Sequence, residues 1–241
     1  MSETTVACLG DSYTEAKESF DWIRALKQRP GNASFRFYNF GIGGDLAYNA
    51  LQRLPDVVNC HPDRLIVLLG TNDVMALIVK QLSGFYRRTK HLPVEPSPDW
   101  YRENMQSIVR RLKMETQARI ALCSLPPLGE DPTSVVPLQA EANRRVAEYN
   151  ATIKQITMDE GVSYLPVHER LQEQILASPG QAFATPSLLQ LGRDAFNRLV
   201  LRRSLDEVGR RNGWYLHTDG IHLNSRGGSV LVDLVQEFIS A

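Results

Sequence analysis

Ser12 stands in the first short motif of this chain that could carry chemistry, Gly10-Asp11-Ser12. The motif follows the apolar run at residues 4–9 and precedes a helical pattern. The hydroxyl is therefore expected at the carboxyl end of a strand and near a helix N-terminus, where negative charge is favoured. A serine in that place could act as a nucleophile. Serine is also a common N-cap, so the motif alone is consistent with a capping role as well.

A candidate acid–base pair lies near the C-terminus, where Asp219 stands three residues before His222. If the chain turns between them, which Gly220 makes easy, the carboxylate can reach Nδ1 of the histidine. Nε2 then stays free to accept a proton from a serine hydroxyl. The alternative is a surface turn that contains an incidental histidine.

Two further segments could stabilise an oxyanion. Gly43-Gly44 can present a backbone N–H without obstruction by a side chain, and Asn72 can donate from its side-chain amide. Acyl transfer builds negative charge on the carbonyl oxygen, and preorganised donors at that point lower the barrier by several kcal/mol. The alternatives are a tight turn at the glycines and helix capping by Asn72 and Asp73.

Other polar residues close to these motifs are expected to support them. Asp11 and Asp73 are predicted to bond nearby backbone N–H groups, and Asp45 could support the glycine loop. His217 is predicted to pack or to hydrogen-bond locally rather than to act as a second base. The remaining histidines are expected at the surface or in loops: His61, His91 and His168.

The elements that must position these residues alternate between strands and helices. Apolar runs predict strands at residues 4–9, 35–40, 65–69, 119–125 and 162–167. Helical periodicity is found around residues 22–26 and at 46–58, 100–116, 138–158 and 229–239. This alternation implies βαβ units and a parallel sheet. Because ligands bind at the carboxyl ends of such strands, the motifs that follow the first three strands should converge at one edge.

Two segments lie outside the alternation within what we predict to be a single domain over residues 1–241. Residues 80–98 contain Pro93, Pro96 and Pro98 and are predicted to form an irregular loop. Residues 178–213 open with a loop and then become helical, with an apolar stripe at Leu188, Leu191, Ala195, Phe196 and Leu199. Both segments are expected to be lids or pocket-lining insertions. The stripe could line an acyl-chain groove, or it could pack on the core or on another subunit.

Taken together, the motifs resemble those of the SGNH (GDSL-type) hydrolase family, which is named after four marker residues. Ser12, Gly44, Asn72 and His222 match these markers in order, and the resemblance extends over residues 4–240. It implies an α/β fold, a flavodoxin-like three-layer α/β/α sandwich with a five-stranded parallel sheet. No metal or organic cofactor is implied.

The resemblance also assigns roles. It implies that Ser12 is the nucleophile, that His222 is the base and that Asp219 orients this histidine. The implied oxyanion hole combines the Ser12 N–H, the Gly44 N–H and the Asn72 side chain, with Gly43 in support. The residue after the nucleophile, Tyr13, is a leucine in many members. We expect it to pack beside the site and to shape the pocket wall without changing the chemistry.

The composition excludes some functions. Lys and Arg together number 27, as do Asp and Glu, and a zero net charge argues against a nucleic-acid-binding protein. The N-terminus lacks a signal-peptide pattern and no stretch is apolar for long enough to span a membrane, so no stable membrane insertion and a cytoplasmic location are expected. The odd set of three cysteines without a CxxC motif fits that location.

The sequence therefore predicts a serine hydrolase that cleaves small-molecule carboxylic esters of small to medium acyl groups through a covalent acyl-enzyme. A carbohydrate O-deacetylase, a lysophospholipase and a thioesterase stay open, because fold and triad do not separate them. The alternative from another class is a non-catalytic flavodoxin-like binding module for phosphate or flavin, but such a module would not need Asp219 and His222 before the last helix. A silent interaction protein is not favoured, since no marker residue is missing. The oligomeric state is left open.

Overall fold

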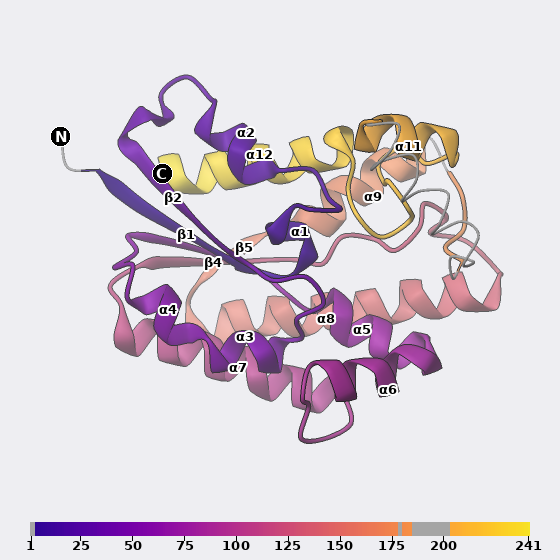
Figure 1. The fold of residues 1–241 in the computed structure, drawn as a ribbon, viewed down its shortest axis with the longest axis horizontal. Helices are drawn as coiled ribbons and strands as arrows, with labels where there is room; N and C mark the ends of the chain where they lie inside the picture. The colour runs from indigo at the N-terminus through magenta and orange to yellow at the C-terminus, as the bar shows by residue number, and fades with distance from the viewer. Residues whose placement is uncertain (1–2, 178–179, 185–202) are drawn as a thin grey trace.

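The computed structural model describes residues 3–177, 180–184 and 203–241, which fold around a parallel sheet (Figure 1). Within these residues the sheet has five strands in the order β2-β1-β3-β4-β5. The strands are β1 (Thr4–Gly10), β2 (Phe35–Gly41), β3 (Arg64–Leu68), β4 (Arg119–Cys123) and β5 (Ser163–Leu165). This is the flavodoxin-like order, and the predicted three-layer α/β/α sandwich is confirmed.

Helices cover both faces of the sheet (Figure 1). One face carries α3 (Ala47–Gln52), α4 (Leu54–Val58), α5 (Thr71–Ile78), α6 (Lys80–Thr89), α7 (Pro98–Glu115) and α8 (Pro137–Glu160). The other face carries α2 (Trp22–Lys27), α9 (Val167–Ala177) and α12 (Ser225–Ser240). Short elements complete the fold: α1 (Ser12–Glu15), η1 (Asn32–Ser34) and α11 (Leu205–Arg211).

The central strands are apolar on both sides because both sides are covered. In β3, Leu65 and Val67 belong to the core beneath α7 and α8, whereas Ile66 and Leu68 belong to the core beneath α12. A strand alternates its side chains between the two faces, so the run Leu65–Leu68 supplies both cores.

Helix α7 shows how local signals and burial agree. Ser97 is its N-cap and accepts a hydrogen bond from the Trp100 N–H at 3.2 Å, and Pro98 occupies its first turn. The apolar positions recur at helical spacing and are fully buried: Met105, Ile108, Val109 and Leu112.

The carboxyl ends of the strands form the edge where the predicted motifs meet. Gly10 ends β1 in register with Gly41 of β2 and with Leu68 of β3. Strands β1 and β3 are neighbours, but the chain leaves β1 toward the face covered by α2 and leaves β3 toward the opposite face. Such a switch point is where ligands bind in open α/β sheets.

The structure corrects three local predictions. The irregular loop expected at 80–98 begins with helix α6, because Leu82 and Tyr86, four residues apart, pack on the core. The single helix expected at 46–58 is divided at Arg53 into α3 and α4. His168 lies in helix α9 and is partly buried, not in a surface loop.

Most of the predicted insertion at 178–213, including the apolar stripe from Leu188 to Leu199, lies outside the described residues. Its described end is α11, where Ser204 and Glu207 form a capping box. Across residues 3–177, 180–184 and 203–241, no helix combines the length and apolar content that a membrane crossing requires.

Candidate active site

Ser12 is the first residue of α1, and Asp11 alone separates it from the end of β1. The N-cap of this helix is Asp11, whose side chain accepts the Tyr13 N–H at 3.1 Å. The capping role that the sequence left open for Ser12 is thus taken by its neighbour. The Ser12 hydroxyl is instead directed to the loop before α12.

His222 joins Ser12 to Asp219 by two hydrogen bonds. Its Nε2 lies 3.0 Å from Ser12 Oγ, and its Nδ1 lies 2.7 Å from Asp219 Oδ2. The other carboxylate oxygen, Oδ1, accepts the backbone N–H groups of Ile221 at 2.9 Å and of His222 at 2.8 Å. The turn between acid and histidine uses Gly220 at φ +87°, where a Cβ would lie 2.7 Å from the Trp214 ring.

The electrostatics of this pair favour a charged carboxylate beside the histidine. Burial alone would raise the pKa of Asp219, but the charge and hydrogen bonds of His222, with the Ile221 N–H, lower that pKa to about 2. Burial alone would lower the pKa of His222, but Asp219 raises it above its usual value. Glu18, whose Oε2 lies 3.5 Å from His222 Nε2, acts in the same direction.

The glycine loop and Asn72 border the same place. Gly44 has φ +75°, and a Cβ built on Gly43 would lie 3.9 Å from Ser12 Cβ. Asn72, in the first turn of α5, donates from Nδ2 to the Asp45 carbonyl at 3.0 Å and makes a longer contact of 3.4 Å with Asp11 Oδ2. The four marker residues are therefore brought together.

Asp45 anchors the glycine loop through an ion-pair network that the sequence only partly suggested. Its carboxylate contacts Arg53 Nε and Lys90 Nζ, both at 2.9 Å. Arg53 also donates to the carbonyls of Gly10 at 2.9 Å and of Phe40 at 2.7 Å. One guanidinium thus fixes the ends of β1 and β2, and no local pattern marks Arg53 for this role.

The two supporting aspartates are buried and accept backbone N–H groups, as expected. Asp73 Oδ2 accepts the Ala47 N–H at 3.1 Å, while Asp11 accepts that of Tyr13. Burial is the main cause that raises the pKa of Asp11 to about 7 and that of Asp73 to about 8.

Glu130 is a site-supporting residue that the sequence did not reveal. Its carboxylate is fully buried and accepts the N–H groups of Tyr215, Leu216 and His217 together with His217 Nδ1. His217 is thereby a local hydrogen-bonding residue, and its Nε2 lies 3.0 Å from the Pro127 carbonyl. This cluster holds the start of the loop that carries Asp219. The only signal for Glu130 is an acidic residue that follows an apolar strand and two prolines.

Tyr13 packs in the core, as predicted. It is buried, and its hydroxyl donates to the Ile221 carbonyl at 2.6 Å. Its ring centroid lies 5.9 Å from that of His222. Tyr13 therefore ties the turn at Ser12 to the loop that carries His222, and it is not among the residues that line the cavity described below.

A cavity of about 350 Å³ opens over Ser12 and His222. One part of its lining is charged and is supplied by Glu15, Lys17 and Glu18. Another part of the lining is apolar or aromatic and consists of Met75, Leu82, Phe85, Tyr86 and Ile221. Gly43, Gly44 and Asn72 complete the lining. Among the described residues, no group of three or more His, Cys, Asp or Glu side chains is arranged to hold a metal ion.

Comparison with known proteins places this geometry in context. The model of the GDSL-like Lipase/Acylhydrolase family matches residues 8–228. Among curated proteins, no sequence matches the chain.

Solved structures share the fold over nearly the whole chain. The acetyl xylan esterase AlAXEase has a TM-score of 0.64 and 19% identity, with 98% of this chain and 99% of that chain covered. Axe2, an acetylxylan esterase from Geobacillus stearothermophilus, has a TM-score of 0.64 and 15% identity, with 100% and 95% covered. A lipase/acylhydrolase from Enterococcus faecalis has a TM-score of 0.61 and 18% identity, with 98% and 95% covered.

Proposed function

Because this chain belongs to the GDSL-like lipase/acylhydrolase family, we propose that it is a serine esterase with Ser12 as nucleophile, His222 as general base and Asp219 as the residue that orients this base. The observation that carries the proposal is the continuous hydrogen-bonded line from Ser12 Oγ through the imidazole to Asp219 Oδ2, with distances of 3.0 and 2.7 Å. Both lie within the range needed for proton transfer and orientation.

In the first step, Ser12 Oγ attacks the ester carbonyl as its proton moves to His222 Nε2. The carbonyl oxygen becomes an oxyanion. When the tetrahedral intermediate collapses, the bond to the alcohol oxygen breaks and the alcohol leaves with the proton from Nε2. Ser12 then carries the acyl group as an ester.

In the second step, water takes the place of the alcohol. His222 Nε2 removes a proton from the water as its oxygen attacks the acyl carbon. The new intermediate collapses, Ser12 Oγ recovers the proton and the carboxylic acid is released. The same histidine therefore acts as base and acid in both halves.

Asp219 makes this histidine effective in two ways. Its Oδ2 accepts the Nδ1–H, which leaves Nε2 as the nitrogen that faces Ser12. Its negative charge stabilises the imidazolium that forms when His222 accepts the proton. The lowered pKa of Asp219 keeps the carboxylate ionised throughout the working range of pH.

The oxyanion is assigned to the N–H groups of Ser12 and Gly44 and to the Asn72 amide. One hydrogen of Asn72 Nδ2 is held by the Asp45 carbonyl at 3.0 Å. The other makes only the 3.4 Å contact with Asp11, and it is this hydrogen that we assign to the oxyanion. As negative charge develops on the carbonyl oxygen in the transition state, this N–H would donate to that oxygen instead of to Asp11.

The cavity supports esters of small to medium acyl groups. Its volume is about 350 Å³. The apolar wall formed by Met75, Leu82 and Phe85 suits a short acyl chain. Two of these residues come from the segment 80–98, which we propose to be a pocket-lining insertion of this single domain.

The charged part of the lining favours carbohydrate O-deacetylation as a second candidate. Glu15, Lys17 and Glu18 lie at the cavity and can hydrogen-bond the hydroxyl groups of a sugar alcohol. The esterases of similar fold named above include acetyl xylan esterases, but at 15–19% identity they share the fold alone.

The test is a panel of p-nitrophenyl esters of graded acyl length, with acetylated sugars and a lysophospholipid, run beside Ser12→Ala. We expect turnover to peak at short or medium acyl groups and to be lost in Ser12→Ala. A fluorophosphonate should label the wild type and leave Ser12→Ala unlabelled. Near wild-type turnover by clean Ser12→Ala protein would overturn the assignment.

A further inference from the structure

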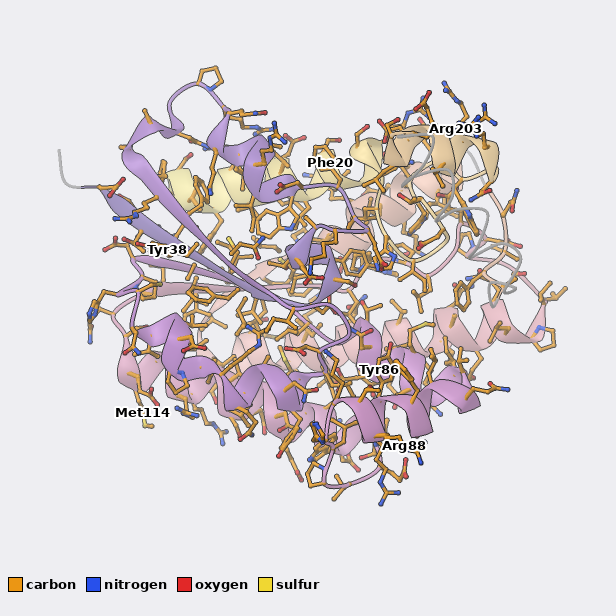
Figure 2. The ribbon with its side chains drawn as sticks, in the orientation of Figure 1. Phe20, Tyr38, Tyr86, Arg88, Met114 and Arg203 are labelled. Carbon is orange, nitrogen blue, oxygen red and sulfur yellow. The ribbon has the colours of Figure 1, made fainter. Side chains whose placement is uncertain are left out.

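We propose that the end of helix α6 holds the oxyanion hole in its working shape, with Tyr86 fixing Asn72 and Lys90 fixing the glycine loop. The inference rests on the proposed function, since it concerns the donors assigned there. It gives two residues outside the family's marker motifs a defined positioning role. Figure 2 shows Tyr86 on the side of α6 that faces the sheet, whereas Arg88 lies on the outer side.

Tyr86 decides which end of the Asn72 amide faces the reacting carbonyl. Its buried hydroxyl donates to Asn72 Oδ1 at 2.8 Å, which leaves Nδ2 on the side of Asp45 and Asp11. An asparagine amide that turned over would present an acceptor to an oxyanion and repel it. The Tyr86 hydroxyl opposes that rotation because it would lose its acceptor.

The Tyr86 hydroxyl stays protonated and can therefore donate its hydrogen bond. Burial raises the pKa of Tyr86 above its usual value, and the carboxyls of Asp11 and Asp73 act in the same direction. The hydroxyl therefore keeps its proton at every pH at which His222 could act as a base.

Lys90 orients the second donor through a peptide group. Its Nζ donates to the Gly43 carbonyl at 2.7 Å. In a trans peptide the carbonyl and the following N–H point in opposite directions. A Gly43 carbonyl held on the lysine side therefore turns the Gly44 N–H away from Lys90, toward the cavity that both glycines line.

The contacts of Tyr86 with Asn72 and of Lys90 with Gly43 both come from the C-terminal end of α6. Lys90 is the C-cap of α6 and also pairs with Asp45 at 2.9 Å. Its backbone carbonyl accepts from Asn49 Nδ2 at 2.9 Å, and Asn49 Oδ1 accepts the Leu46 N–H at 3.2 Å. The end of α6 is thereby joined to the start of α3, and the same hydrogen-bonded cluster contacts both donors.

A role in positioning predicts a particular kinetic signature. Removing an oxyanion donor outright costs about 100- to 1,000-fold in kcat, so loosening one donor should cost about 10-fold. KM should change little, because these donors act on charge that exists only in the transition state. A purely structural role would instead lower thermal stability with kcat per active site unchanged.

The experiment uses the full chain with Tyr86→Phe and Lys90→Met and a matched control for each. Tyr164→Phe also removes a hydroxyl that donates to a side chain, Glu169, and Lys113→Met also removes an ammonium that donates to a backbone carbonyl, that of Glu160. The kcat and KM for a short p-nitrophenyl ester are measured, with kcat expressed per active site titrated by fluorophosphonate. This normalisation removes any misfolded fraction. We expect about 10-fold losses in kcat for the two α6 variants and none for the controls.

A double-mutant cycle separates positioning from general damage. If Tyr86 acts through Asn72, then Tyr86→Phe should lower kcat by less than about two-fold once Asn72 is already alanine. Full additivity would overturn the role of Tyr86, and an unchanged kcat in Lys90→Met would overturn that of Lys90. Failure of the proposed function is distinguishable, since it appears as activity retained by Ser12→Ala.

Discussion

Replacing Glu130 by glutamine tests whether one buried carboxylate holds the loop that carries Asp219 and His222. Glu130 has no exposed side-chain surface. It accepts four hydrogen bonds, from the N–H groups of Tyr215 at 2.8 Å, Leu216 at 2.6 Å and His217 at 3.0 Å, and from His217 Nδ1 at 2.9 Å. The other ring nitrogen of His217, Nε2, lies 3.0 Å from the Pro127 carbonyl.

The size of the stability loss follows from what the amide does to the four hydrogen bonds. A glutamine oxygen in the place of Oε1 keeps the donors Leu216 N, His217 N and His217 Nδ1, whereas the NH₂ group is turned toward the Tyr215 N–H. The buried Tyr215 N–H left unsatisfied costs about 1–3 kcal/mol, and each of the other three hydrogen bonds is weakened by up to about 1 kcal/mol because its acceptor is no longer charged. We therefore expect a loss of about 3 kcal/mol in the free energy of unfolding. For a domain of this size that corresponds to a decrease of roughly 6–12 °C in Tm.

Thermal unfolding followed by circular dichroism measures the effect. Glu169→Gln is the control, because it removes the charge of a carboxylate that accepts hydrogen bonds from two hydroxyls, those of Ser124 at 3.0 Å and Tyr164 at 2.7 Å, but lies in α9, away from the loop. A Glu130→Gln protein whose Tm is within about 2 °C of wild type, or equal to that of the control, would refute the reasoning.

The acid limb of stability supplies a second readout for the same variant. Burial alone would raise the pKa of Glu130, but the hydrogen bond and charge of His217 and the loop N–H groups lower it. A carboxyl whose pKa is lowered by folding stabilises the protein above its unfolded pKa of about 4.3 and loses that contribution as the pH falls through the folded value. The difference in stability between wild type and Glu130→Gln should therefore shrink below about pH 4.

Three further predictions concern the site and the cysteines. Asp219→Asn should lower kcat by about 10³- to 10⁴-fold in steady-state ester assays while the fold is kept, and a loss below about ten-fold would contradict its role. Because the pKa of His222 is raised, kcat/KM should rise with pH through a midpoint above about 6.5. Glu18→Gln should lower that midpoint, and an unchanged midpoint would show that Glu18 does not affect the pKa of His222. In the native protein an aromatic disulfide reagent should modify Cys60 alone, because Cys8 and Cys123 are buried and burial raises the pKa of their thiols. Peptide mapping that finds Cys8 or Cys123 labelled first would contradict this packing.

Much of the fold could be predicted from local pattern. Continuous apolar runs indicated the central strands β1, β3 and β4, because strands covered on both faces carry no polar alternation. The edge strand β2 was indicated by an aromatic run instead. The spacing of apolar residues indicated α7, α8 and α12, because each of these helices buries one face against the sheet. The motifs around Ser12, Asn72 and the glycines each followed a strand, so a parallel sheet had to bring them to one edge.

Helix α6 shows where local pattern fails. Its sequence is polar apart from a few apolar positions, and the nearby prolines suggested a loop. The helix begins at Lys80 and ends before the prolines, and Leu82 and Tyr86 stabilise it by packing on a core formed by distant segments. Burial of that kind depends on tertiary neighbours and leaves little trace in a short window.

The sequence by itself determined which residue types are available for chemistry, because Ser12, the glycines and Asn72 each follow a strand, and Asp219 and His222 precede the last helix. Only the tertiary structure decided what holds them. The contacts of Asn72 with Tyr86, of Gly43 with Lys90 and of the loop before α12 with Glu130 join residues 14, 47 and more than 80 positions apart. Side chains so far apart meet only through the packing of whole elements, and hydrogen bonds between them are fixed by geometry that no local motif encodes.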